Sequence, residues 1–537
     1  MSLHQPLGGR WRPQLDRPAL VALVLGAAGV GYRFVLTLHT VPGANSDEAT
    51  FGLAALHISE GREHPVFLYG QRYMGMLESY LAAPLVALAG PSWPVLRLPL
   101  LVLYGLFLWL IHRLTRRIGS PWFATLVVGL LALGSERVVR DQLTVVGGRP
   151  EVKVAVLVML LVAVGLARGT IRHRWFAVGL FGLLAGVAVW SDWLILPYVG
   201  AATLTLLWAA RRELLGWAGT LLVAGFAVGI APIIRDNLLA PPGENSLSVF
   251  REIGARPEPA PPWSQRVSGA VLEGIPLATG LCPVSGCGRW QALFGLLYPV
   301  LLAAAAVVAV VAYRRAAGRA GRIAPVVHLA LVVGAALTLV AYARSPLAAI
   351  DPLANVRYLS VLQLSLPAVL WPVWRAAVPA WRGSAGALRR LTGAVATAAL
   401  AALAAAALVV TVLFAAVGTG ATRTEERAAR DLADAMRANG PREVYGHYWT
   451  CNRLIFNTRE EVVCGVLDEG FTPGQNRYPP YWDRVAAADR PGYVVESGSS
   501  LERRLRRLLG DRADAALVVE VGGYRVYHPE TPVRPWR

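Results

Sequence analysis

The amino-acid sequence predicts an α-helical, polytopic membrane protein that carries a small extracytoplasmic α/β domain at its C-terminal end. Of its 537 residues, 55% are hydrophobic and only 16% are charged, a balance that is not typical of a water-soluble domain. Apolar runs of about 20 residues, the length that crosses a bilayer as a helix, recur along the chain. From about Gly420 the pattern changes to short apolar strands that alternate with amphipathic helices.

Eleven runs are long and apolar enough to be membrane spans. They lie near residues 19–38, 93–112, 121–136, 152–167, 175–190, 193–210, 215–233, 291–313, 324–342, 358–374 and 391–416. The first run is too long for the apolar core of a signal peptide, and no small-x-small cleavage site follows it. We therefore expect it to be retained, so that an odd number of spans separates the two ends of the chain.

The net charge of +18 would suggest a nucleic-acid partner in a soluble protein, but its distribution here indicates topology instead. Every second connecting segment is rich in arginine, and these segments together hold nineteen arginines against two acids, Asp16 and Glu213. Cytoplasmic loops of membrane proteins carry this excess. We expect a multi-pass protein of the plasma membrane with a cytoplasmic N-terminus, an extracytoplasmic C-terminal domain and no nucleic-acid partner.

The predicted division is a membrane domain of residues 1–419 and an extracytoplasmic α/β domain of residues 420–537. The inner loops are short, whereas two outer loops are long. The first outer loop, 40–93, contains amphipathic stretches that predict helices on the membrane surface. The second, 234–290, is rich in Pro and Gly and is expected to be irregular, like a lid. The tail strands are expected at 443–448, 461–467, 493–496, 516–521 and 524–527.

All four cysteines fall in segments that are expected to lie outside the cytoplasm. Their spacings, with four residues between Cys282 and Cys287 and twelve between Cys451 and Cys464, lack the paired C-x2-C pattern of a zinc site. An oxidising compartment favours two local disulfides, Cys282–Cys287 and Cys451–Cys464. Free buried thiols are the alternative.

Two adjacent carboxylates, Asp47 and Glu48, follow directly after the first predicted span. A solvated loop would explain them without any function. The next residues have an apolar face at helical spacing, which predicts that the pair lies on a surface helix at the rim of the hydrocarbon, close to groups carried by lipids. We interpret Asp47 and Glu48 as candidate catalytic carboxylates.

The order of a span, an Asp-Glu pair and surface helices resembles the C-type (GT-C) glycosyltransferases. These membrane enzymes, which include the protein O-mannosyltransferases and the lipid A aminoarabinose transferases, take a sugar from a polyprenyl-phosphate donor. The resemblance is most specific in the runs Ser46–Ala49, Tyr69–Glu78 and Asn355–Leu359, and extends more weakly over all eleven spans. It implies a GT-C fold and an inverting transfer of a monosaccharide to an extracytoplasmic glycan, lipid or protein hydroxyl.

The chemistry of such a transfer is consistent with these residues. A lipid phosphate is already a good leaving group, so the enzyme needs a base for the acceptor hydroxyl and cations for the phosphate. The family's base corresponds to Asp47, which Glu48 would support. Arg357 is most similar to the family's phosphate-contacting arginine, and the next residue, Tyr358, is a candidate ligand of the same phosphate.

Arg149 and Arg72 are further candidate phosphate ligands, and Glu78 is a possible second carboxylate of the site. Each also has a structural explanation: arginines commonly extend to the lipid interface, Arg149 lies in the tight turn Gly147–Glu151, and Glu78 fits a helix N-terminus. No Asp, Glu or His cluster has metal-ligand spacing, so no required cofactor or metal is predicted, although some relatives use a divalent metal.

Two other classes of function remain. A transporter or flippase of lipid-linked substrates usually has charges buried at the bilayer midplane and broken helices there, whereas here the charges lie near the predicted outer rim. A non-catalytic membrane anchor with a glycan-binding tail would not need Asp47. The predicted partners are therefore a polyprenyl-phosphate sugar donor, an extracytoplasmic acceptor and membrane lipids.

Overall fold

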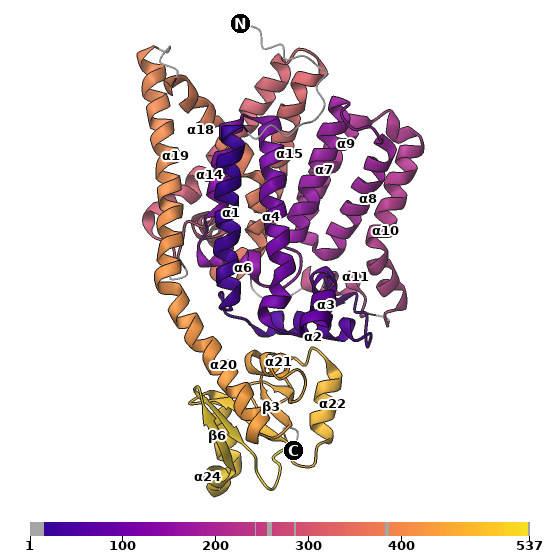
Figure 1. Cartoon of the computed structure of the whole chain (residues 1–537), viewed down its shortest axis with the longest axis vertical. Coiled ribbons are helices and arrows are strands. Elements are labelled where there is room, and N and C mark those ends of the chain that lie inside the picture. The colour runs from indigo at the N-terminus through magenta and orange to yellow at the C-terminus, as the bar shows by residue number, and fades with distance from the viewer. Residues whose placement is uncertain (1–15, 242, 255–259, 284–285, 382–385, 535–537) are drawn as a thin grey trace.

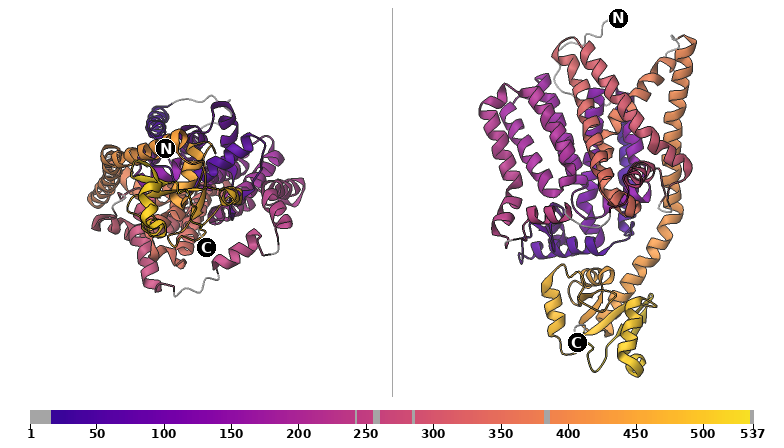
Figure 2. Two further views of the ribbon diagram at one scale, coloured as in Figure 1. Left: turned by 90° about the horizontal axis from the view of Figure 1, so that it is seen from below. Right: turned by 180° about the vertical axis from the view of Figure 1, so that it is seen from behind.

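The helices of the protein form a tall bundle, and a small domain lies against one end of it (Figure 1). The computed structural model describes residues 16–241, 243–254, 260–283, 286–381 and 386–534. We call the end of the bundle that faces this domain, where the first span ends at Leu38, the domain end. That span begins at the opposite end of the bundle (Figures 1 and 2). Residues 1–15 and 382–385, which include some of the predicted inner arginines, lie outside the described residues.

Within the described residues, ten helices are long and apolar enough to cross a membrane, and a bent pair makes a possible eleventh. This confirms the predicted fold class and a multi-pass membrane protein. The ten are α1 (Arg17–Leu38), α4 (Trp93–Ile118), α7 (Pro150–Arg168), α8 (Arg174–Ser191), α9 (Leu196–Ala210) with the turn before it, α10 (Trp217–Leu239), α14 (Arg289–Arg315), α15 (Gly318–Arg344), the stretch Pro352–Val378 that contains α17 (Pro352–Asn355) and most of α18 (Leu366–Trp381), and the long helix Ala387–Asn439.

The span that was predicted near residues 121–136 is not straight. It consists of α5 (Pro121–Ala132) and α6 (Glu136–Leu143), which are bent by 91°. The bend frees backbone carbonyls that would be unsatisfied in a membrane. The fully buried guanidinium of Arg33, from α1, satisfies one of these carbonyls, because its Nη1 donates a hydrogen bond to the carbonyl of Ala132 at 2.8 Å. The polar helix α6 thereby comes to lie at the domain end.

Residues 40–93, which were predicted to form the first outer loop, make a layer between the bundle and the small domain (Figure 1). It contains α2 (Ser46–Ser59), a hairpin of β1 (Phe67–Leu68) and β2 (Gln71–Gly75), and α3 (Leu77–Ala89). The prediction of helices is confirmed, but α2 does not have one face in water. It packs on α3 on one side and on the small domain on the other, so its polar side chains are buried as well as its apolar ones.

The second outer loop was predicted to be irregular, and this is wrong for most of its described residues. After α10 the chain forms α11 (Ser246–Gly254), α12 (Trp263–Ser268), a π-turn at Gly269–Gly274 and α13 (Ile275–Ala278). Of the prolines that indicated irregular structure, the described ones are Pro241, Pro261 and Pro262, and they stand between these helices, where proline costs no helical hydrogen bond.

The small domain is a five-stranded mixed sheet with helices around it. Its strands are β3 (Glu443–His447), β4 (Val463–Leu467), β5 (Gly492–Glu496), β6 (Leu517–Val521) and β7 (Tyr524–Tyr527), in the spatial order β4-β3-β5-β7-β6. Its helices are α20 (Thr419–Asn439), α21 (Tyr448–Asn457), α22 (Pro479–Ala487), α23 (Ser500–Leu509) and α24 (Ala513–Ala516). The first three strands are parallel neighbours, whereas β7 runs antiparallel to β5 and β6. Each strand lies within a residue or two of its predicted range.

The last span and the small domain share one helix. The helix α19 (Ala387–Leu413) passes through a π-turn at Phe414–Gly418 directly into α20, without a loop at residues 419 and 420. Figure 2 shows this helix running along the side of the bundle and into the domain. The domain is therefore attached through a continuous helix at one side and through its contact with α2 at the other.

Candidate active site

Asp47 lies in the first turn of α2, where the positive end of the helix dipole favours a carboxylate. The helix begins after Asn45, whose side chain accepts a hydrogen bond from the backbone N–H of Glu48. From Ser46 to His57, Asp47 alone is not buried, and 23% of its side chain is exposed. The packing that covers α2 therefore leaves one carboxylate accessible.

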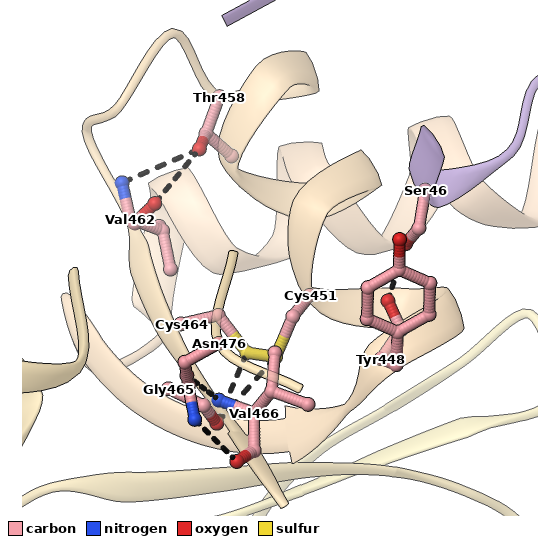
Figure 3. Close-up of a disulfide and its surroundings, with 9 residues drawn as sticks. All are labelled: Ser46, Tyr448, Cys451, Thr458, Val462, Cys464, Gly465, Val466 and Asn476. Carbon is pink, nitrogen blue, oxygen red and sulfur yellow. Dashed lines mark hydrogen bonds between the residues drawn. A yellow bond between two sulfur atoms is a disulfide. The ribbon is translucent and has the colours of Figure 1, made fainter. Parts of the chain in front are cut away.

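The small domain supplies two polar side chains to Asp47. Arg477 Nη2 donates to Asp47 Oδ1 at 2.7 Å, and the hydroxyl of Tyr448 donates to the same oxygen. Ser46 in turn donates its hydroxyl to the backbone carbonyl of Tyr448, a contact that Figure 3 shows. Residues 46–47 of α2 and the first residue of α21 thus hold each other at two points, and Arg477 adds a third contact to Asp47.

Arg357 and its neighbour Tyr358 lie in the same region. Arg357 Nη2 donates to the Tyr358 hydroxyl at 3.2 Å, and its guanidinium carbon lies 5.1 Å from the centre of that ring. The hydroxyl of Tyr73, from β2, is within electrostatic range of Tyr358, Arg357, Arg477 and Asp47 together. Burial raises the pKa of Tyr73, while the two arginines act to lower it. One phenol thus lies among the predicted base and two guanidinium groups.

Glu48 has a different environment from Asp47, although the two are adjacent. It is fully buried, and it accepts from Arg97 Nε at 2.7 Å and Nη2 at 2.6 Å in a bidentate ion pair. Arg97 belongs to α4 and is fully buried too. Glu48 also accepts from the backbone N–H of Val145. These bonds fasten α2 to the bundle, so Glu48 holds the helix that carries Asp47.

Arg149 lies near Arg357 and is paired. Its Nη1 donates to Asp141 of α6 at 2.9 Å, and both side chains are almost fully buried. Burial lowers the pKa of Arg149, and the nearby charges of Arg137 and Arg357 act in the same direction. Arg149 is therefore a neighbour of Arg357, and it shares the carboxylate of Asp141 with Arg137, whose Nη2 lies 3.2 Å from the same oxygen.

Glu78 begins α3 and is fully buried. Its Oε2 accepts from the backbone N–H of Gly147 at 2.8 Å, while Glu151 accepts from the N–H groups of Gly148 and Arg149. Burial, and then the charge of Glu151, raise the pKa of Glu78 well above its ordinary value. Glu78 thus helps to hold the Gly147–Glu151 turn. Gly147 and Gly148 have positive φ angles in this turn, a conformation that glycine adopts without strain.

Arg72 pairs with acidic residues other than Asp47. It contacts Asp236 of α10 at 3.4 Å and Glu244 at 3.5 Å. Its neighbour Tyr73 points into the site because side chains alternate along β2. Arg72 was predicted as a phosphate ligand and Tyr73 was not predicted as a site residue, although the alternation of side chains along β2 separates the two.

All four cysteines are paired. Cys282 is bonded to Cys287, and Cys451 is bonded to Cys464. The second disulfide joins α21 to β4, one turn after Tyr448, and Figure 3 shows it beside the contact with Ser46. It therefore supports the helix that presents Tyr448 to Asp47.

Within the part of the chain that the structure describes, no group of three or more His, Cys, Asp or Glu side chains is arranged to hold a metal ion. Besides Tyr73, the sequence did not predict Arg477 and Tyr448 as site residues. They lie more than 400 residues from Asp47 in the sequence, and no local pattern marks them.

No family model matches the sequence, and no curated protein matches it significantly. Solved structures do match. ArnT from Cupriavidus metallidurans in the apo state matches with a TM-score of 0.57 and 15% identity, over 95% of this chain and 98% of that one. The same protein bound to undecaprenyl phosphate gives 0.54 and 14%, over 94% and 97%. The apo oligosaccharyltransferase from Archaeoglobus fulgidus gives 0.50 and 14%, over 90% and 70%.

These identities are low, so what the likeness establishes is the fold. ArnT, a lipid A aminoarabinose transferase, and the oligosaccharyltransferase are both GT-C glycosyltransferases. They are matched over nearly all of this chain, including the helical bundle and the small domain. The chain therefore has the fold of the C-type (GT-C) glycosyltransferases, as its sequence predicted.

Proposed function

We propose that the protein is an inverting glycosyltransferase that transfers a monosaccharide from a polyprenyl-phosphate donor to a hydroxyl of an extracytoplasmic glycan, lipid or protein. The observation that carries this proposal is the accessibility of Asp47. It is the one unburied residue on an otherwise covered stretch of α2, and it lies beside guanidinium groups at the domain end of a GT-C fold. The polyprenyl donor is proposed because a solved structure with this fold has undecaprenyl phosphate bound.

In the proposed reaction Asp47 takes the proton from the acceptor hydroxyl as that oxygen attacks the anomeric carbon of the sugar. The bond from this carbon to the phosphate oxygen breaks on the opposite face, so the configuration inverts. The electron pair leaves with the lipid phosphate, whose growing charge Arg357 stabilises. The products are the glycosylated acceptor, the polyprenyl phosphate and a proton on Asp47.

The neighbouring residues act through placement. Tyr358 fixes the guanidinium of Arg357, and Tyr73 offers a hydroxyl to the substrate at the centre of the site. Arg149 and Glu78 keep the Gly147–Glu151 turn in place below it. In this proposal residues 1–419 form the transferase domain in the plasma membrane, with the N-terminus in the cytoplasm. Residues 420–537 cover the site from outside.

The test is a transfer assay with the full chain in membranes, using a polyprenyl phosphate that carries a radiolabelled sugar. We expect label to move to an extracytoplasmic fraction, and NMR of the isolated product to show an anomeric configuration opposite to that of the donor. Label that crosses the membrane while still attached to lipid would favour a flippase. Binding of glycan without any transfer would favour the non-catalytic anchor.

A further inference from the structure

We propose that Arg477 of the small domain binds the phosphate of the donor together with Arg357, while the same guanidinium holds the base Asp47. This inference rests on the proposed function and adds a substrate ligand to it. It also gives the small domain a direct part in the reaction, since Arg477 would complete the site from the opposite side.

The segment around Arg477 is fixed from both directions. The side chain of its predecessor, Asn476, accepts a hydrogen bond from the backbone N–H of Val466 in β4 at 2.8 Å and donates one to the carbonyl of Val466 at 3.1 Å. Its successor, Tyr478, donates to Glu63 of the first outer loop at 2.6 Å. The backbone of Arg477 also passes close over Gly70, where an added Cβ would lie 3.5 Å from its Cα. Arg477 is therefore held rigidly over the site rather than being a flexible surface arginine.

The hydrogen bonds of Arg477 leave one of its nitrogens unused. Nε donates to the Tyr448 hydroxyl at 2.6 Å and Nη2 donates to Asp47 Oδ1 at 2.7 Å. The third nitrogen, Nη1, is buried and has no hydrogen-bond partner among the described residues. The residue as a whole is only 6% exposed. A buried charged donor without a partner is costly, and a guanidinium presents several donors in one plane. An anionic oxygen of a substrate would satisfy it.

The charges of the site favour a phosphodiester. Two guanidinium groups beside one carboxylate leave one positive charge unmatched among Asp47, Arg357 and Arg477. A polyprenyl-phosphate sugar carries one negative charge and would balance it. After transfer Asp47 holds a proton and the phosphate monoester approaches two negative charges, so the same two arginines still match it. Arg357 Nε is a second buried donor without a partner among the described residues.

Holding the base and the phosphate with one guanidinium would also set the geometry of the reaction. Both contacts from the small domain are made to Asp47 Oδ1, and no described residue donates to Oδ2. Oδ2 is thus left to receive the proton of the acceptor. Because Arg477 would touch both groups, the base and the leaving phosphate would keep a fixed separation across the sugar.

The test compares binding of polyprenyl phosphate with binding of the uncharged polyprenol, using the full chain in nanodiscs. Arg477→Gln should weaken polyprenyl-phosphate binding about tenfold or more and leave polyprenol binding unchanged within about twofold. The control is Arg62→Gln, which removes an arginine that bridges to Glu460 across the same interface. It should change neither affinity. Arg477→Lys keeps the charge and should retain most of the phosphate affinity, but transfer should stay slow because an ammonium cannot bond both Asp47 and the phosphate in this geometry.

The possible failures can be told apart. If Arg477→Gln binds polyprenyl phosphate as tightly as the wild type, or weakens both lipids equally, Arg477 is only a contact between domains and the inference is wrong. Full transfer activity in Arg477→Lys would also contradict it. If the wild type itself shows no preference for polyprenyl phosphate over polyprenol, the proposed donor fails, and this inference fails with it.

Discussion

Asp47 and Glu48 are consecutive residues whose side chains leave α2 in different directions. Asp47 points toward the small domain, where Tyr448 and Arg477 bind it. Glu48 points into the bundle and pairs with Arg97. Successive positions on a helix are about 100° apart, so one of two adjacent carboxylates can be accessible while the other is locked in place.

The first prediction concerns Glu48→Gln. Removing one partner of a fully buried ion pair leaves the other charge buried without compensation, so the free energy of unfolding should fall by about 3 to 5 kcal/mol. Thermal unfolding of the purified chain measures it. In the variant Glu48→Gln/Arg97→Met both charges are gone, and much of the loss should be recovered. Equal destabilisation by the single and the double variant would mean that the pair is not coupled.

At the scale of elements, the contact between α2 and α21 depends on a glycine. A Cβ at Gly52 would lie 2.5 Å from the ring of Phe456 in α21. This ring is 2% exposed and packs against Trp93, with the ring centroids 4.5 Å apart, so it has little room to move. The short side chain at residue 52 therefore lets the small domain approach the helix that carries Asp47.

The second prediction follows from this contact. Gly52→Ala should push α21 away from α2, lower the transfer rate, and make the small domain more sensitive to protease. Gly31→Ala is the matched control, because it adds the same methyl group to α1 with nothing within 4 Å. The control should be neutral or slightly stabilised, since alanine favours helix by about 1 kcal/mol over glycine. Similar behaviour of the two variants would show that the close contact is unimportant.

Sequence patterns predicted elements well where one residue type dominates a stretch. The apolar spans and the tail strands were recognised because hydropathy and alternation are local properties. The bend between α5 and α6 was missed because its support comes from Arg33, about 100 residues away. The helices of the second outer loop were missed because its prolines indicate breaks in helical structure, whereas short helices form between those breaks.

On the scale of the whole molecule, an acidic group joins the small domain to the first outer loop. Glu460 accepts hydrogen bonds from His57 Nε2 at 3.0 Å and from the Tyr481 hydroxyl at 2.7 Å, and it pairs with Arg62. Burial alone would raise the pKa of Glu460, but these hydrogen bonds lower it from 4.5 to about 2. The contact is therefore strongest with the carboxylate ionised.

The third prediction is the pH dependence of this contact. Because the pKa of Glu460 is depressed in the folded protein, its stabilisation is complete above about pH 4.5 and is lost as the pH falls toward 2, by about 3 kcal/mol in total. The unfolding temperature of the wild type should fall over this range relative to that of Glu460→Gln, which lacks the titrating group. A constant difference between the two proteins from pH 5 to pH 2.5 would contradict the assignment.

The candidate site was only half predictable because it is assembled from both ends of the chain. Asp47 and Arg357 stand in segments with recognisable surroundings, a span followed by an acidic pair and a span preceded by Arg-Tyr. Tyr448 and Arg477 have no such context, since their role depends on how the small domain docks onto α2. Docking is fixed by long-range packing, which a single sequence does not reveal.

The most direct test of the central claim, that Asp47 is the base, is the transfer rate of Asp47→Asn. Asparagine keeps the shape of the side chain but cannot take a proton, so turnover should fall by about a hundredfold or more while polyprenyl-phosphate binding is retained. Asp236→Asn, which alters another half-buried carboxylate paired with an arginine at the domain end, is the control and should transfer at the wild-type rate. Wild-type turnover in Asp47→Asn would contradict the account.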